Sequence, residues 1–332
     1  MTTVAVLGGG SWGTALADLL ARKGCSVRLW AYEPEVVAAI NNDHENPLFL
    51  PGVSLAPTLV ACADAAAAVR GAELIVSAAP SHAVRRVVQR VRNEVAAGTV
   101  VVSATKGLET DSLALMSAVL HEVLPTARVA VLSGPSFAQE VAAGQPTAVV
   151  AAAADGDTAR EVQRVFSTPR FRVYTGSDVV GVELAGALKN VIAIAAGILE
   201  GLGLGHNPRA ALLTRGLAEI TRLGTAMGAD PLTFAGLAGM GDLILTATGS
   251  LSRNRALGIA LAEGQQFESY RVAHRSVAEG ANTSRAAAAL ATRLGVELPI
   301  TEQVCAVLFS GKPAQTSVTE LMERELKSEQ WR

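Results

Sequence analysis

One lysine lies in a stretch of sequence that is otherwise too apolar to hold a charge. In ELAGALKNVIAIAAGIL, the pair Lys189 and Asn190 stands among Ala, Leu, Val, Ile and Gly residues. A helix that is apolar all round is buried, and burial lowers the pKa of a lysine because it disfavours the charged form. Such a lysine can exchange a proton near neutral pH. A lysine that snorkels to the surface, or one paired with Glu183, would explain the same residues.

A carboxylate and a hydroxyl further along the chain have helical spacing. The stretch GLAGMGDLILTATG carries Asp242 and Thr246 at positions i and i+4. If the segment is helical, both side chains lie on one face, where Asp242 could orient or pair with a catalytic lysine. An acid without a catalytic role fits the residues equally well.

Two short motifs place polar groups where a ligand could bind. Lys106 in ATKGLE, and Gly134 and Ser136 in SGPSFAQE, each follow an apolar run, and ligands of open α/β sheets bind at the carboxyl ends of strands. An exposed loop lysine is the alternative for Lys106.

The stretch GSLSRNRALG places Ser252, Arg253 and Asn254 at the start of a helix. A capping serine, free N–H groups and a guanidinium together make a phosphate clamp. A plain N-cap followed by solvated arginines has the same sequence.

The N-terminal stretch VAVLGGGSWGTALADLL contains the pattern G-x-G-x-x-G at Gly8, Gly10 and Gly13. The first glycine allows a tight turn, the second lets a diphosphate approach the backbone, and the third lets a helix pack on a strand. The pattern therefore predicts a dinucleotide whose phosphates bind at a helix N-terminus.

Glu33 follows the second apolar run, where a carboxylate can bind ribose hydroxyls and would repel a 2′-phosphate. These residues favour NAD over NADP on charge, although Glu33 could equally be the first-turn acid of the next helix.

Alternating elements must position these residues. Short β-branched runs occur at 3–8, 26–31, 73–79, 99–105, 128–133, 147–153 and 171–174, with helical patterns at 11–23, 33–41, 81–96 and 111–124 between them. This alternation predicts a parallel sheet with helices on both faces. After residue 176 the pattern is helical only, which divides the chain into residues 1–180 and residues 181–332.

Composition limits the function. The chain has 332 residues, half of them apolar, which favours two domains. A net charge of −2 gives no basic field for nucleic acid. The histidines lack metal-ligand spacing, and the three cysteines lack C-x-x-C spacing, so we expect no metal and free thiols.

The sequence also predicts a cytoplasmic protein. The N-terminus has no basic region followed by an apolar leader. The most apolar stretch, 191–205, is shorter than the roughly 20 residues needed to span a bilayer and contains Glu200, so we expect no membrane span.

In their order along the chain, the motifs GGGSWGTALA, ATKGLE, SGPSFAQE, ALKNVIAIAAGI, GMGDLILTATG, SRNRALG and VAEGANT resemble the bacterial-type NAD(P)-dependent glycerol-3-phosphate dehydrogenases. The resemblance covers essentially the whole chain. It implies a doubly wound, mostly parallel Rossmann domain, then an all-α domain of the 6-phosphogluconate dehydrogenase-like type, with the active site between them.

Position by position, the resemblance implies that Lys189 is the proton donor and acceptor, assisted by Lys106, Asp242 and Thr246. The substrate-binding residues would be Lys106, Gly134, Ser136, Lys189, Asn190, Asp242, Ser252, Arg253 and Asn254. The cofactor-binding residues would be Gly8, Gly10, Ser11, Trp12, Gly13, Tyr32, Lys106, Ala138, Arg253, Val277 and Glu279.

The implied reaction is reduction of dihydroxyacetone phosphate to sn-glycerol 3-phosphate with NADH or NADPH, which would supply phospholipid synthesis. The Ala-rich helical domain favours a homodimer. Two alternatives are a related two-domain β-hydroxyacid dehydrogenase and a dinucleotide sensor without catalytic activity. The phosphate clamp at Ser252, Arg253 and Asn254 argues against a carboxylate substrate.

Overall fold

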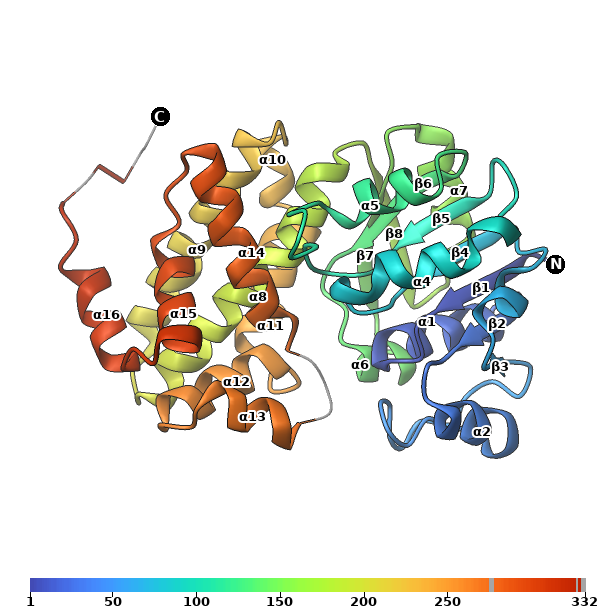
Figure 1. Ribbon diagram of the computed structural model, residues 1–332, viewed down its shortest axis with the longest axis horizontal. Helices are drawn as coiled ribbons and strands as arrows, with labels where there is room; N and C mark the ends of the chain where they lie inside the picture. The colour runs from blue at the N-terminus through green and yellow to red at the C-terminus, as the bar shows by residue number, and fades with distance from the viewer. Residues whose placement is uncertain (275–277, 327, 330–332) are drawn as a thin grey trace.

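The computed structural model describes residues 1–274, 278–326 and 328–329. Figure 1 shows two parts side by side: a sheet with its covering helices, and a bundle of helices. All strands belong to the first part of the chain. They are β1 (Thr3–Leu7), β2 (Ser26–Trp30), β3 (Val60–Cys62), β4 (Leu74–Ser77), β5 (Val100–Ser103), β6 (Arg128–Ser133), β7 (Thr147–Ala152) and β8 (Phe171–Gly176).

The eight strands form one sheet in the order β3-β2-β1-β4-β5-β6-β7-β8. Neighbouring strands are parallel except β6 and β7, which are antiparallel. The chain order reverses between β1 and β4, and ligands of such sheets bind at the carboxyl ends of the strands beside this reversal. The predicted mostly parallel, doubly wound sheet is confirmed.

Both faces of the sheet are covered, because alternate residues of one strand enter different cores. Val4 and Val6 of β1 pack in one buried cluster, while Ala5 and Leu7 pack in another. Strands buried on both faces are apolar at every position, which explains the continuous apolar runs in the sequence. The covering helices are α1 (Ser11–Arg22), α2 (Pro34–Asp43), α3 (Ala65–Val69), α4 (Val84–Val91), α5 (Met116–Val123), α6 (Ala138–Ala142) and α7 (Gly156–Phe166), with 3-10 turns η1 (Ser81–Ala83) and η2 (Arg92–Glu94).

The second part of the chain is helical throughout its described residues. Its helices are α8 (Val179–Gly201), α9 (His206–Ala226), α10 (Pro231–Phe234), α11 (Asp242–Thr248), α12 (Arg253–Ala262), α13 (Phe267–Ala273), α14 (Glu279–Leu294), α15 (Pro299–Ser310) and α16 (Ala314–Met322), with a π-helical segment η3 (Leu237–Gly241) before α11.

Helix α8 forms the centre of this bundle and is buried along most of its length. It packs closely against α12 through two glycines. A Cβ on Gly197 would lie 2.0 Å from the carbonyl oxygen of Arg255, and a Cβ on Gly258 would lie 2.1 Å from that of Ile194. Only residues without a side chain allow this approach of two backbones. Although α8 is long and apolar enough to cross a membrane, 83% of its most apolar window is buried inside the protein, as in a core helix.

The structure corrects one expected helix. The pattern at 111–124 predicts a helix from its first residue, but α5 begins only at Met116. Leu113 has a left-handed backbone, with φ of 63°, and Leu108 forms a bridge with Leu115. A residue with positive φ cannot continue a right-handed helix, so this segment forms a turn before α5. The short strand β3 and helix α3 were not predicted.

Candidate active site

The buried lysine of α8 contacts a carboxylate and a hydroxyl on α11. Lys189 Nζ donates to Asp242 Oδ1 at 2.5 Å and to Thr246 Oγ1 at 2.7 Å. Thr246 in turn donates to Asp242 Oδ1 at 3.3 Å. All three residues are at most 6% exposed. The expected shared face of Asp242 and Thr246 is present, and it faces Lys189.

A second lysine reaches the same carboxylate from the sheet. Lys106 follows β5, and its Nζ donates to Asp242 Oδ2 at 2.7 Å and to the carbonyl oxygen of Gly134 at 2.9 Å. Asp242 therefore holds two ammonium groups, one from each part of the chain. Gly134 has φ of +137°, and a Cβ there would lie 2.9 Å from Val149 Cα, so only glycine fits this turn.

The pKa of Lys189 is lowered to about 7. Burial has the largest effect, because it disfavours the ammonium, and the charge of Lys106 lowers the pKa further. The charge of Asp242 opposes both effects. Lys189 can therefore gain or lose a proton near neutral pH, as a general acid and base requires.

The π-helical segment η3 sets the position of Asp242. It ends at Gly241, and Asp242 begins α11. Within η3, a Cβ on Gly239 would lie 2.0 Å from the carbonyl oxygen of Phe234, so the wide turn lies directly on α10. Single π-helical turns occur frequently at functional sites, and here one directs a carboxylate toward two lysines.

Two side-chain amides connect four segments around these lysines. Asn254 Nδ2 donates to Asn190 Oδ1 at 2.9 Å, and Asn254 Oδ1 accepts from the Gly280 N–H at 3.0 Å. Asn190 Nδ2 lies 3.4 Å from the carbonyl oxygen of Lys106. The amides thus join α8, α12, α14 and the loop after β5.

The predicted phosphate clamp lies at the start of α12. Ser252 is the N-cap residue, and its Oγ accepts from the Arg255 N–H at 3.2 Å. Arg253 is the first residue of the helix and is exposed. Ser136 donates to the carbonyl oxygen of Gly134 at 2.9 Å. The same carbonyl oxygen accepts from Lys106 Nζ. A helix N-terminus with a guanidinium on its first residue suits an anionic group.

The glycine-rich turn has the shape that a dinucleotide needs. Gly8 has φ of +130°, and its Cβ would lie 2.7 Å from the backbone of Ala78. A Cβ on Gly13 would lie 1.9 Å from the carbonyl oxygen of Gly8. At Gly10, by contrast, no atom lies within 4 Å of the Cβ position. The turn is closed on the protein side and open at Gly10, which precedes α1, so a diphosphate fits there.

The other expected cofactor residues lie after β2 and at the starts of helices. Ser11 and Trp12 begin α1. Tyr32 is 74% exposed after β2, and Ala138 begins α6. Glu33, the N-cap residue of α2 by position, makes no capping hydrogen bond with its side chain. Val277 lies outside the described residues.

Glu279 joins the bundle to the sheet. It begins α14, and its Oε2 accepts from Ser81 Oγ at 2.9 Å. Its Oε1 lies 3.4 Å from the Ser81 N–H. Burial raises the pKa of Glu279, and the hydrogen bonds from Ser81 oppose this rise. Ser81 follows β4, so Glu279 lies at the carboxyl edge of the sheet.

Comparison with known proteins agrees with this geometry. Residues 3–159 match the family model of the NAD-dependent glycerol-3-phosphate dehydrogenase N-terminus, and residues 178–319 match that of the C-terminus. The chain belongs to the NAD-dependent glycerol-3-phosphate dehydrogenase family. Its predicted resemblance to this family is therefore confirmed.

Curated relatives and solved structures cover nearly the whole chain. A glycerol-3-phosphate dehydrogenase [NAD(P)+] of Geobacter sp. strain M21 is 56% identical over 98% of both chains. That of Moorella thermoacetica is 53% identical over 99% of both. A crystal structure of glycerol-3-phosphate dehydrogenase from Coxiella burnetii superposes with a TM-score of 0.94 at 42% identity, covering 97% of this chain and 99% of that one.

Glu183 of this family member does not pair with Lys189, which removes one of the structural explanations for the lysine. It accepts from the Ser117 N–H at 2.9 Å and from Ser117 Oγ, and so caps α5 from the bundle. Burial raises the pKa of Glu183 to about 7. The sequence motifs did not indicate the hydrogen bonds made by Ser81, Ser117 and the buried Asn46.

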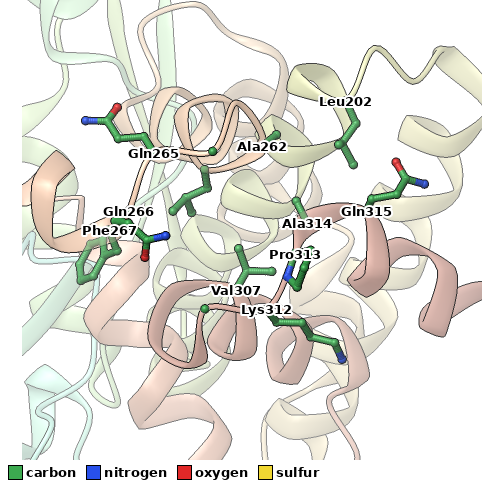
Figure 2. Close-up of a pocket in the computed structure, with 13 residues that line it drawn as sticks. Leu202, Ala262, Gln265, Gln266, Phe267, Val307, Lys312, Pro313, Ala314 and Gln315 are labelled. Carbon is green, nitrogen blue, oxygen red and sulfur yellow. The ribbon is translucent and has the colours of Figure 1, made fainter.

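The bundle contains a hollow of about 260 Å³ that neither Lys106 nor Lys189 lines. Figure 2 shows side chains from the ends of α8, α12 and α15 and from the start of α16 around it. No residue of the candidate site lines it. Among the described residues, no group of three or more His, Cys, Asp or Glu side chains could hold a metal ion.

Proposed function

We propose that the protein reduces dihydroxyacetone phosphate reversibly to sn-glycerol 3-phosphate with NADH or NADPH. The observation that carries this proposal is a buried lysine with a pKa near 7 that is held by Asp242 and Thr246. The open glycine-rich turn after β1 supplies a place for the dinucleotide. Family membership and relatives more than half identical support the same reaction. The product would supply phospholipid synthesis.

Lys189 is the proposed general acid. An ammonium has three N–H donors, and Asp242 and Thr246 accept two of those of Lys189. The third is available to the C2 carbonyl oxygen of the substrate, which becomes an alkoxide during reduction. Proton transfer from Lys189 neutralises that charge, and the ammonium of Lys106 stabilises it electrostatically. In the reverse direction, neutral Lys189 removes the hydroxyl proton.

The start of α12 is proposed to bind the substrate phosphate. Ser252, Arg253 and Asn254 offer a capped helix N-terminus and a guanidinium, with Ser136 and Gly134 on the facing loop. Because the phosphate does not react, this contact positions the C2 carbonyl next to Lys189. The phosphate site separates this proposal from a β-hydroxyacid substrate, which has no phosphate dianion.

The residues proposed to hold the dinucleotide are Gly8, Gly10, Ser11, Trp12 and Gly13 around the diphosphate. Tyr32, Ala138, Lys106, Arg253 and Glu279 would contact its other groups, with Val277 proposed from the motif alone. When bound, the nicotinamide supplies the hydride. Glu33 would repel a 2′-phosphate, so we propose a preference for NADH.

We further propose that residues 1–180 and 181–332 are the two domains, that the protein is cytoplasmic, and that it forms a homodimer. The change from strand to helix between Gly176 and Val179 supports the division. The whole-chain likeness to glycerol-3-phosphate dehydrogenases supports the location. The homodimer rests on the Ala-rich composition of the bundle, and sedimentation of the purified protein tests it.

The deciding assay follows the absorbance of the reduced nicotinamide while dihydroxyacetone phosphate is added. We expect oxidation that requires the phosphorylated substrate, with NADH faster than NADPH at equal concentration. Lys189→Ala should abolish turnover and leave dinucleotide binding nearly unchanged. Binding without oxidation in the wild-type protein would instead support a sensor, and oxidation by β-hydroxyacids alone would support the related dehydrogenase class.

A further inference from the structure

A fully buried amide lies behind the glycine-rich turn. Asn46, in the loop between α2 and β3, is 0% exposed. Its Nδ2 donates to the carbonyl oxygen of Gly9 and to Thr14 Oγ1, both at 2.9 Å. Its Oδ1 accepts from the Phe49 N–H at 3.1 Å. A buried amide with both ends bonded is costly to disrupt, since each lost partner leaves a polar group unpaired.

These bonds fix the orientation of one peptide group. The carbonyl of Gly9 and the N–H of Gly10 belong to the same planar, trans peptide and point in opposite directions. Asn46 and Thr14 both donate to the Gly9 oxygen, the latter at 3.2 Å. Rotating this peptide would break both hydrogen bonds. The Gly10 N–H is therefore held on the side away from Asn46.

The turn is open at Gly10 and closed at its other glycines. At Gly9 a Cβ would lie 2.5 Å from Ala31 Cβ, so the turn is closed there, as it is at Gly8 and Gly13. At Gly10 nothing lies within 4 Å of the Cβ position. A glycine residue has a flexible backbone, so a turn of consecutive glycines needs outside contacts to keep its N–H groups aligned.

The loop that carries Asn46 also braces the start of α1. Ser11 Oγ donates to the carbonyl oxygen of Phe49 at 2.5 Å, and the Leu50 N–H donates to the carbonyl oxygen of Asn46 at 2.9 Å. The loop 46–50 thus contacts the turn at Gly9 and the first helical residue at Ser11. The N–H groups of a helix start are the donors that bind phosphates.

We propose that Asn46 is a positioning residue for the dinucleotide diphosphate: by holding the Gly9 carbonyl, it presents the Gly10 N–H and the start of α1 to the phosphates. The inference rests on the proposed function, because it requires a dinucleotide at this turn. Loss of the amide should weaken dinucleotide binding by about tenfold, the equivalent of one hydrogen bond, without altering the lysine site.

The test measures dissociation constants by the fluorescence of NADH and by competition with ADP-ribose, which keeps the diphosphate and lacks the nicotinamide. The variant is Asn46→Ala. Its matched control is Asn41→Ala, because Asn41 also bonds the backbone through both ends of its amide, at Ala61, without contacting the turn. Steady-state kinetics then give KM for each substrate, and thermal melts report folding.

We expect Asn46→Ala to raise the dissociation constants of both NADH and ADP-ribose, and KM for NADH, while kcat and KM for dihydroxyacetone phosphate stay near those of the wild type. Asn41→Ala should lower the melting temperature without weakening binding. Equal effects of the two variants on binding, or unchanged binding in Asn46→Ala, would overturn the inference.

A second variant keeps the inference testable if Asn46→Ala does not fold. Thr14→Val keeps the shape of the side chain and removes the other donor to Gly9. It should weaken the binding of NADH and of ADP-ribose in the same way. Dissociation constants equal to those of the wild type in Thr14→Val would then overturn the inference. If the wild-type protein bound neither NADH nor NADPH, the proposed function would fail and this inference with it. Wild-type binding together with unaffected variants removes only the role of Asn46.

Discussion

Replacing Asp242 by asparagine removes a negative charge from between two ammonium groups and keeps the shape of the side chain. The carboxylate accepts from Lys189 at 2.5 Å and from Lys106 at 2.7 Å. The pKa of Lys189 is about 7 because burial and Lys106 lower it and Asp242 raises it. In Asp242→Asn only the two lowering effects remain. The pKa of Lys189 should therefore fall below 7.

The size of this fall follows from the contact distance. An opposite charge at this range shifts a pKa by about 1 to 3 units, and each unit corresponds to about 1.4 kcal/mol. The side chain of Lys189 is 7% exposed, so solvent screens the interaction little. Reduction needs the ammonium, so its activity is lost as pH rises through the pKa of Lys189. That alkaline limb should move about 1 to 3 pH units lower in Asp242→Asn.

The assay is the pH dependence of kcat/KM in both directions, from about pH 4 to about pH 10. Oxidation of sn-glycerol 3-phosphate needs neutral Lys189, so its acidic limb should move down in the same variant. Thr246→Val changes no charge and should leave both limbs in place, whereas Lys106→Met removes a cation and should move both upward. A profile of Asp242→Asn that is lower but not displaced would refute this explanation of the pKa.

Two further variants test the contacts at the edges of the site. The pKa of Glu183 is about 7 in the folded protein and ordinarily 4.5, so the folded state keeps a proton that the unfolded state releases, and the stability from its neutral form is lost as pH rises through this window. Thermal melts at both ends of this pH window compare the stability of Glu183→Gln with that of the wild type. As the pH rises through the window, the variant should become about 3 kcal/mol more stable relative to the wild type. A stability difference that does not change with pH would contradict the raised pKa. Ser252→Ala removes the N-cap of α12, so it should cost about 1 kcal/mol of stability and raise KM for dihydroxyacetone phosphate about tenfold. An equal rise in KM for NADH would argue against a phosphate site there.

Residues whose role depends on spacing could be predicted from the sequence. The glycine pattern gave the turn at Gly8, Gly10 and Gly13, because each position has its own steric requirement. The interval from Asp242 to Thr246 gave a shared helix face. The partner of Lys189 could not be decided in this way, since Glu183 and Asp242 are both acids and only tertiary packing brings one of them to the ammonium.

Other features depend on a single residue in a loop and leave no periodic signal. Asn46 precedes a proline, a pair typical of turns, so nothing in the sequence indicates that its amide is buried against Gly9. The late start of α5 has the same origin. Leucine is a good helix former, so residue type does not indicate the left-handed backbone of Leu113. That backbone follows from the turn between Leu108 and Leu115.

The two halves of the site differ in how far apart their contacts lie along the chain. Asn46 lies 37 residues from Gly9, whereas Lys106 lies 136 residues from Asp242, and Ser81 lies 198 residues from Glu279. Contacts that are close in sequence form earlier, and synthesis begins at the N-terminus. The diphosphate site can therefore assemble on a growing chain before the lysine site exists. We expect a dinucleotide to act as a folding ligand that stabilises the N-terminal half while the bundle is still being made.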